Sequence, residues 1–196
     1  MFEQLHQHMY DLADAAMVRP GDVVLDVGAH LGVYTAVALR RGAAQVVAIE
    51  AEPVNAGCLA KTFAAEIASG RVVLVPAAAW ESEGTLTFHV RNNSLTGSVT
   101  FNKGRPVEVP ATTLDLIVER NHLSRVDLIK MDIEGGERYA LRGAEQTIAR
   151  FKPRMAICVY HLPDDPIVIP DLVRGFRTDY TIREQGTGAA HVMYFY

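Results

Sequence analysis

The segment VVLDVGAHLGVYTAVAL, residues 23–39, runs from an apolar strand through two glycines into an apolar helix. It predicts a strand over residues 23–27 and a helix over about residues 32–41. Because the strand is continuously apolar rather than alternating, it is typical of a parallel sheet that is covered on both faces. The turn between the two elements is the kind of loop that binds a nucleotide-like cofactor at the start of a helix.

The composition is that of an ordinary globular domain. The chain has 196 residues, of which 49% are hydrophobic and 21% are charged, and its net charge is −4. With a pI near 6.0, its charge favours neither nucleic acid nor an anionic membrane as a partner. No apolar run reaches the ~20 residues of a membrane-spanning helix, and the acidic first segment is unlike a secretory signal. We therefore expect a single cytoplasmic domain over residues 1–196, and the sequence leaves its oligomeric state open.

Further elements follow along the chain in alternation. Strands are predicted over residues 45–50, 71–75, 127–131, 155–160, near 181 and 191–196, and helices over residues 53–67, 113–120, 137–150 and 171–175. An amphipathic helix within residues 1–19 is expected to pack on this domain, and GTLTFHV (84–90) and SVTF (98–101) are expected to form a small β insertion. Alternating strands and helices predict an open α/β sheet with right-handed crossovers.

The first loop discriminates between cofactors. A dinucleotide fingerprint that starts at Gly28 requires glycines at positions 30 and 33, where the chain has His30 and Val33. A phosphate-binding Walker loop is excluded because no Gly-Lys-Ser/Thr follows. The pattern D-x-G-x-x-x-G from Asp26 to Gly32 instead resembles motif I of the class I S-adenosylmethionine-dependent methyltransferases.

Each residue of this pattern has an expected chemical role. Gly28 allows the chain to turn where a Cβ would collide with the ligand. Gly32 and Thr35 open a helix whose free N–H groups can face the methionine carboxylate of the cofactor. Asp26 can bind the cofactor's ammonium, directly or through water. Glu50, at the end of the second strand, can accept hydrogen bonds from both ribose hydroxyls.

A second informative stretch is VDLIKMDIEGGERYALRGA, residues 126–144. Lys130, Asp132 and Glu134 alternate, so they project to one side if the strand stays extended as far as Glu134. Charges crowded at the end of a strand beside the cofactor loop favour a functional role for the two carboxylates. Lys130 is either a further member of the site or an ion-pair partner that holds them. Glu137 is expected to be structural, because a carboxylate in the first turn of a helix suits the helix dipole.

Here the chain resembles the FkbM-type methyltransferases over residues about 22–185. The resemblance rests on DVGAHLGVYT, AIEAEP, VPAAAW and TTLDLIVERN, and most on DLIKMDIEGGERYALRGA. It implies a Rossmann-like class I methyltransferase fold, with a mostly parallel seven-stranded sheet, an antiparallel last strand and a small β insertion. It also implies S-adenosyl-L-methionine as the cofactor and methylation of an oxygen on a sugar or another small natural-product-like acceptor.

The resemblance gives a set of candidate site residues. The expected cofactor-binding residues are Asp26, Gly28, Ala29, His30, Gly32, Thr35, Glu50 and Ala78, and the expected catalytic residues include Lys130, Asp132 and Glu134. In the family a Pro commonly follows the ribose-binding acid directly, whereas here the sequence is Glu50-Ala51-Glu52-Pro53. Either Glu50 or Glu52 could therefore bind the ribose, and the length of the strand favours Glu50.

The stretch CVYHLPDDP, residues 158–166, places His161 at the end of the fifth strand. With an ordinary pKa of ~6.5 it could act as the general base that removes the acceptor's hydroxyl proton, or it could be only a polar cap. No metal is expected. His6 and His8 would lie about 200° apart on a helix, and Asp132 with Glu134 could hold Mg²⁺ but lacks an evident third ligand.

The insertion adds a possible acceptor contact. Asn92, Asn93 and Ser94 offer groups suited to a polyhydroxylated acceptor, although the same residues are common at exposed hairpin tips. The sequence thus predicts an S-adenosylmethionine-dependent O-methyltransferase that acts on a small hydroxylated acceptor. A catalytically inactive cofactor-binding module is the alternative, and an NAD-dependent oxidoreductase is disfavoured by His30 and Val33.

Overall fold

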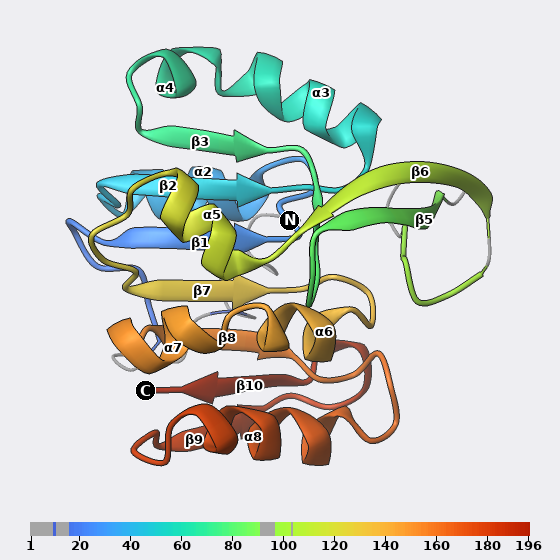
Figure 1. Cartoon of the computed structure of the whole chain (residues 1–196). Coiled ribbons are helices and arrows are strands. Elements are labelled where there is room, and N and C mark those ends of the chain that lie inside the picture. The colour runs from blue at the N-terminus through green and yellow to red at the C-terminus, as the bar shows by residue number, and fades with distance from the viewer. Residues whose placement is uncertain (1–9, 11–15, 91–96, 103) are drawn as a thin grey trace.

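The structure, a computed structural model, describes residue 10 and residues 16–90, 97–102 and 104–196 (Figure 1). The predicted N-terminal helix, His6 and His8, and the loop residues Asn92, Asn93 and Ser94 lie outside the described residues. Within the described part of the chain, no helix has both the length and the apolar character needed to cross a bilayer.

The centre of the molecule is a seven-stranded sheet with the order β3-β2-β1-β7-β8-β10-β9. Its strands are β1 (Val23–Val27), β2 (Gln45–Ile49), β3 (Val72–Val75), β7 (Leu128–Met131), β8 (Arg154–Cys158), β9 (Ile182–Gln185) and β10 (Val192–Phe195). Only β10 runs antiparallel to its neighbours in this sheet. The expected mostly parallel sheet with an antiparallel last strand is confirmed, and its continuously apolar strands are buried as predicted.

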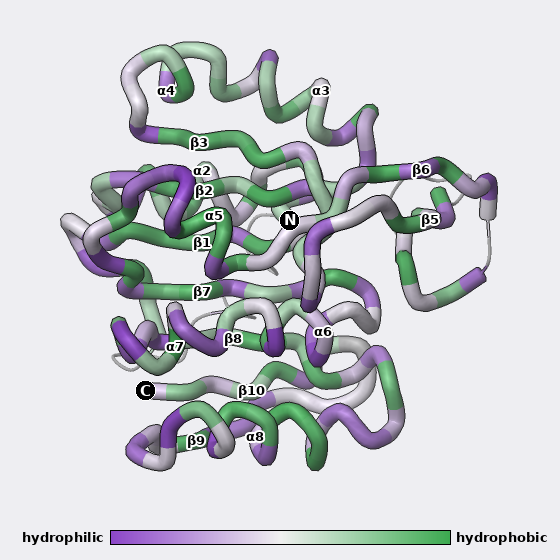
Figure 2. The backbone as a smooth tube through the Cα atoms, in the orientation of Figure 1, coloured by the Kyte–Doolittle hydropathy of each residue, from purple (hydrophilic) through white to green (hydrophobic). Residues whose placement is uncertain are grey.

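Helices cover both faces of the sheet. The helices are α2 (Val33–Arg40), α3 (Pro53–Thr62), α4 (Ala64–Ala68), α5 (Leu114–Arg120), α6 (Glu137–Arg142), α7 (Glu145–Phe151) and α8 (Asp165–Phe176), and a short 3-10 turn, η1, spans Gly188–Ala190. In Figure 1, α5, α6 and α7 lie in front of the sheet and α2 lies behind it. The strands form the apolar interior in Figure 2, whereas the helices carry both hydrophobic and hydrophilic segments.

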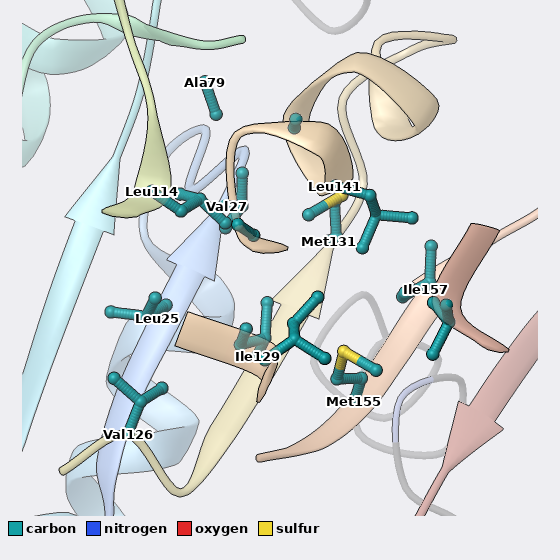
Figure 3. Close-up of a cluster of buried hydrophobic side chains, with 14 of the residues drawn as sticks. Leu25, Val27, Ala79, Leu114, Val126, Ile129, Met131, Leu141, Met155 and Ile157 are labelled. Carbon is teal, nitrogen blue, oxygen red and sulfur yellow. The ribbon is translucent and has the colours of Figure 1, made fainter. Parts of the chain in front are cut away.

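The largest apolar cluster fills the space between the sheet and the front helices. Leu25 and Val27 of β1 lie beside Ile129 and Met131 of β7, and Leu141 of α6 packs over them (Figure 3). All five side chains are fully buried, and burial of each such side chain is worth about 1.5–3 kcal/mol. This packing fixes β1 against β7, the two strands whose carboxyl ends carry the predicted site residues.

The β insertion is confirmed, but its pairing differs from the prediction. It is a three-stranded sheet of β4 (Ala78–Ala79), β6 (Arg105–Thr112) and β5 (Gly84–Val90), in that order. The expected strand at residues 98–101 is wrong, because Ser98 makes only an isolated bridge to His89. Figure 1 shows β5 and β6 extending beyond the carboxyl ends of the parallel strands.

The sequence reading missed β6 because it contains two prolines. The carbonyl of Thr112 accepts a hydrogen bond from Trp80, just beyond β4, so Thr112 faces the edge of β6 opposite β5. Pro106 and Pro110 lie an even number of residues from Thr112 and face the same edge. Their missing N–H groups therefore cost no hydrogen bond to β5.

Two predicted helices are each divided in the structure. The helix expected over residues 137–150 consists of α6 and α7, and the break lies at Gly143, where a Cβ would sit 2.1 Å from the carbonyl oxygen of Trp80. The helix expected over residues 53–67 is divided at Phe63 into α3 and α4. Conversely, α8 begins at Asp165, well before the predicted start at residue 171, because Pro166 and Pro170 obscured its first turns.

A pair of glycine substitutions tests the close approach of Gly143 to the carbonyl oxygen of Trp80. We expect Gly143→Ala to destabilise the protein by about 1–3 kcal/mol, because the new Cβ displaces the backbone at Trp80. Gly175→Ala in α8 is the matched control, since a Cβ there meets nothing within 4 Å. It should stabilise by about 0.4–1 kcal/mol through lower unfolded-state entropy. Urea unfolding measures both changes, and equal effects would contradict the packing at Gly143.

Candidate active site

A cavity of about 320 Å³ lies beyond the carboxyl ends of β1, β2 and β7. Since the strand order reverses between β1 and β7, it lies at the switch point where open α/β sheets bind ligands. Most of the predicted site residues line it: Gly28, Ala29, His30, Glu50, Ala78, Lys130, Asp132 and Glu134. Four others do not line it: Asp26, Gly32, Thr35 and His161.

The two glycines of the first loop are required by the protein itself. Gly28 has φ 79°, and a Cβ there would lie 2.0 Å from the backbone oxygen of Asp132. Gly32, the N-cap of α2, has φ 83°, and a Cβ there would lie 2.3 Å from the ring of Phe63. The neighbouring β7 segment thus already requires a glycine at position 28, and the close approach of a ligand to Gly28 stays a prediction.

Asp26 is buried beneath the loop rather than exposed at the cavity. Its Oδ2 accepts a hydrogen bond of 2.7 Å from the hydroxyl of Thr35, and its Oδ1 lies 3.1 Å from Nζ of Lys130. Asp26 and Thr35 are both 0% exposed. Both residues anchor the start of α2 to β1 and β7, and the contact of Asp26 with a cofactor's ammonium, directly or through water, stays a prediction.

Lys130 places a buried ammonium at the wall of the cavity. Its Nζ donates a 2.7 Å hydrogen bond to the carbonyl of Gly28, as well as pairing with Asp26. Burial alone lowers the pKa of Lys130, but the charges of Asp26 and Asp132 outweigh burial and raise it. The ammonium therefore stays charged and holds the loop against β7.

Glu50 lies where the sequence placed it, at the end of β2 and on the cavity wall. Its Oε2 accepts a 2.7 Å hydrogen bond from the N–H of His30, and its Oε1 accepts one of 2.8 Å from the N–H of Glu52. Burial raises the pKa of Glu50, against the lowering effect of these two hydrogen bonds. The carboxylate is thus held in one orientation before any ligand binds.

Glu52, the alternative ribose ligand, has a structural task of its own. It is the N-cap of α3, and its Oε2 accepts a 2.7 Å hydrogen bond from the N–H of Asn55. Glu52 also lines the cavity. One carboxylate oxygen of Glu52 is therefore committed to the cap of α3, whereas both oxygens of Glu50 accept backbone N–H groups.

Asp132 forms the opposite wall of the cavity together with Tyr10. The Tyr10 hydroxyl donates a 2.5 Å hydrogen bond to Oδ2 of Asp132. Burial alone raises the pKa of Asp132, but Lys130, the Tyr10 hydrogen bond and His161 outweigh it, so the pKa lies below its usual value. Sequence reasoning missed Tyr10, because no motif near residue 10 indicates a contact with a residue more than a hundred positions away.

Glu134 reaches the cavity by a route that differs from the prediction. The condition for strand alternation, an extended chain as far as Glu134, is not met, because β7 ends at Met131 and Glu134 has φ 54°. A left-handed conformation is uncommon for glutamate and is found most often at functional sites. The turn, rather than strand alternation, brings Glu134 to the same cavity as Lys130 and Asp132.

Glu137 holds this turn from inside and also faces His161. Its Oε1 accepts a 2.8 Å hydrogen bond from the N–H of Ile133, and its Oε2 accepts one of 2.9 Å from the N–H of Gly135. Nδ1 of His161 lies 3.0 Å from the same Oε1. The structural role expected for Glu137 is present, but the contact with His161 is additional and was not foreseen.

His161 lies behind the carboxylates of the cavity wall. Its Nε2 is 3.6 Å from Oδ1 of Asp132 and 3.7 Å from Oε2 of Glu134. Burial lowers the pKa of His161, but the hydrogen bond and charge of Glu137, with the charges of Asp132 and Glu134, raise it to about 9. The base role was predicted with an ordinary pKa. The role of His161 as a general base stays a prediction. Asp132 and Glu134 line the cavity and His161 does not.

Known proteins resemble this chain in sequence and in fold. A sequence model of the methyltransferase FkbM domain family matches residues 26–178. Methyltransferase FkbM from Methylobacillus flagellatus has a similar structure, with 22% identity and a TM-score of 0.69, over 90% of this chain and 44% of that one. The present chain therefore spans less than half the length of that protein.

Two further structures share the fold. An rRNA methylase from Streptococcus thermophilus has 15% identity and a TM-score of 0.55, over 91% of this chain and 87% of that one. Fibrillarin from Aeropyrum pernix, with natively bound S-adenosyl-L-methionine, has 14% identity and a TM-score of 0.51, over 91% and 68%. At these identities the likeness concerns the fold alone. None of the curated proteins matches the chain.

The buried pair of Lys130 and Asp26 gives a stability prediction. Lys130→Met should destabilise the protein by about 3–5 kcal/mol, because it leaves the carboxylate of Asp26 buried without its cation. Adding Asp26→Asn should recover part of this loss, since the uncompensated charge is then removed. Urea unfolding of the single and double variants measures the coupling.

The matched control is the exposed pair of Arg120 and Glu83, at 2.7 Å. Arg120→Met should change stability far less than Lys130→Met does, because water screens that exposed pair. A Lys130→Met protein as stable as the Arg120→Met protein would contradict the role assigned to the buried ion pair.

Proposed function

Because the chain belongs to the FkbM methyltransferase family, we propose that it uses S-adenosylmethionine to methylate a hydroxyl oxygen of a small acceptor, such as a sugar or a natural-product-like molecule. The observation that carries the proposal is the carboxylate of Glu50, which two backbone N–H groups hold at the wall of the cavity beside the Gly28 loop. A carboxylate held in this way is suited to accept hydrogen bonds from a ribose diol.

The residues of the cavity fit this cofactor. Glu50, Glu52, Asp132 and Glu134 give the wall more negative than positive charge, with Lys130 as the buried cation among them. Such a wall is complementary to a cofactor that carries a sulfonium and an ammonium. The first turn of α2, from Val33, also reaches the cavity, and the helix dipole favours the cofactor's carboxylate there. When bound, the cofactor supplies an electrophilic methyl group.

The other end of the cavity would receive the acceptor. The carboxylates of Asp132 and Glu134 line this end, and either can accept the proton of an acceptor hydroxyl as the oxygen becomes nucleophilic. His161 lies within 3.7 Å of both and, with its pKa raised to about 9, would position them as an imidazolium. Most of the acceleration would come from holding the hydroxyl in line with the methyl group.

Charge and size support a small acceptor. The chain has a net charge of −4, and its cavity wall is acidic, so a polyanion would be repelled from the point of reaction. The β insertion adds apolar wall through Phe88 and Val99, which suits the non-polar face of a small molecule. These features favour a neutral hydroxylated acceptor over RNA, although proteins of the same fold include an rRNA methylase.

The ribose assignment is tested by an isosteric change. Glu50→Gln should weaken S-adenosylmethionine binding by at least about tenfold, because hydrogen bonds to a charged group are worth about 1.5–3 kcal/mol each. Glu52→Gln should chiefly lower stability, by about 1 kcal/mol, through the weakened α3 cap. Calorimetric titration measures affinity, and the reverse ranking of the two variants would move the ribose site to Glu52.

The acceptor class is tested by product analysis. Incubation with methyl-labelled S-adenosylmethionine should label neutral sugars or other hydroxylated small molecules on oxygen, and it should leave ribosomal RNA unlabelled. The acidic wall is the physical reason for this preference. Label found on RNA, or on a nitrogen, would contradict the proposed acceptor. Cofactor binding without turnover on any acceptor class would favour a binding module instead.

A further inference from the structure

We propose that Tyr10 is a positioning residue of the candidate active site, and that its hydroxyl holds the Asp132 carboxylate in one direction at the acceptor end of the cavity. Tyr10 is 2% exposed and lines the cavity together with Lys130 and Asp132. It lies 122 positions before Asp132 in the chain, so the fold alone brings the two together. The catalytic meaning of this contact rests on the proposed methyl transfer, whereas the contact itself does not.

The ring of Tyr10 is held by two neighbouring elements. It meets the ring of Tyr34, in α2, edge-on, with the centroids 5.6 Å apart and an interplanar angle of 80°. Nζ of Lys130, in β7, lies 5.3 Å from the centroid of the Tyr10 ring, where a cation is attracted to the aromatic face. Contacts to α2 and β7 thus fix the ring, and with it the direction of the hydroxyl.

The hydroxyl donates a 2.5 Å hydrogen bond to Oδ2 of Asp132. This is the length of a charge-assisted bond from a hydroxyl to an anionic oxygen. Burial raises the pKa of Tyr10, and the charge of Asp132 raises it further. The phenol therefore keeps its proton and stays a donor to the carboxylate.

The other oxygen of Asp132 has weaker contacts. The hydroxyl of Tyr160, which follows β8, donates to Oδ1 at 3.4 Å, and Nε2 of His161 lies 3.6 Å from the same oxygen. The thiol of Cys158 lies 4.0 Å from the Tyr10 hydroxyl, at the back of the pair. Of these contacts, the bond from Tyr10 is the shortest and is expected to set the direction of the carboxylate.

These neighbours keep Asp132 anionic. Burial raises its pKa, but the charge of Lys130, the hydrogen bond from Tyr10 and the charge of His161 outweigh burial and lower it, with a further lowering by Cys158. A carboxylate has about four lone-pair sites, so the Tyr10 bond leaves room for a hydrogen bond from a hydroxyl of the acceptor. An anion of fixed direction would align that hydroxyl with the methyl group.

The variant Tyr10→Phe isolates the hydroxyl, because it keeps the ring and removes only the donor. We expect kcat for methyl transfer to fall by about tenfold or more at neutral pH, since the carboxylate is no longer held in one direction. The acid limb of the pH profile of kcat should move to higher pH, because loss of the donor raises the pKa of Asp132. Calorimetric titration should give the S-adenosylmethionine affinity of the wild type, since Glu50 and the Gly28 loop are unchanged.

A second readout needs neither cofactor nor acceptor. Carboxyl-carbon NMR follows the protonation of Asp132 as the pH is lowered, and the signal is assigned by its loss in Asp132→Asn. It should titrate at higher pH in Tyr10→Phe than in the wild type. Tyr160→Phe, which removes the longer bond, should move the titration in the same direction by less.

The matched control is Tyr180→Phe, because the surroundings of Tyr180 repeat those of Tyr10 away from the cavity. The Tyr180 hydroxyl donates a 2.8 Å hydrogen bond to the carbonyl of Pro153. Its ring meets that of Phe195 edge-on at 6.0 Å, and Nζ of Lys152 lies 5.7 Å from its centroid. This control should leave kcat, the acid limb and the carboxyl titration at their wild-type values.

Three results would overturn the role of Tyr10. They are a wild-type titration of Asp132 in Tyr10→Phe, a wild-type kcat and acid limb in the same variant, and an unfolded Tyr10→Phe protein in thermal melting, since the contact would then serve the fold alone. The proposed function fails separately. A shifted Asp132 titration in a protein that methylates no acceptor would overturn methyl transfer and support the contact.

Discussion

The structure depends on a buried ammonium at the point where the sheet changes direction. Lys130 of β7 lies opposite Asp26 of β1 in the parallel ladder, and its Nζ pairs with that carboxylate at 3.1 Å. The same Nζ donates to the carbonyl of Gly28 in the loop above. One cation therefore connects two strands and the cofactor loop. Because Lys130 and Asp26 are both buried, a movement that separates them would leave a charge in the interior without its partner.

A steric constraint acts beside this electrostatic one. The backbone of Gly28 approaches the carbonyl of Asp132 so closely that a Cβ would lie 2.0 Å away. The loop after β1 and the segment after β7 thus form one unit, and the side chains of Asp132 and Glu134 emerge from that unit. The position of Asp132 and Glu134 on the cavity wall is therefore set by the same contact that sets the loop after β1. Two reacting groups can be aligned only when the segments that hold them are fixed relative to each other.

The sequence predicted individual residues better than it predicted their partners. The apolar runs of β1, β2 and β7 gave their positions nearly to the residue, because strands buried on both faces leave an unbroken hydrophobic signal. The strand β6 was missed because prolines normally interrupt strands. They are tolerated here because they face the edge of β6 that does not pair with β5.

The same limit applies to the candidate site. Motif residues such as Glu50 and Asp132 were found on the cavity, but the contact of Tyr10 with Asp132 joins distant parts of the chain without a local pattern. The burial of Asp26 also could not be read from a motif, because it depends on which cation lies opposite it in the sheet. Periodicity reports which face is buried, whereas partners across the sheet follow from topology and register.

The fold does not by itself select an acceptor, and the charge of the cavity wall is the feature of this site that bears on the choice. An rRNA methylase, fibrillarin and an FkbM protein have similar folds, so the architecture by itself does not select an acceptor. A site that receives RNA must tolerate phosphates close to the reacting atom, and basic side chains normally provide this. Here the wall carries Glu50, Glu52, Asp132 and Glu134, and Lys130 is turned inward to Asp26. An ammonium committed to the protein cannot neutralise a phosphate, and the acidic wall therefore supports the proposal of a neutral hydroxylated acceptor.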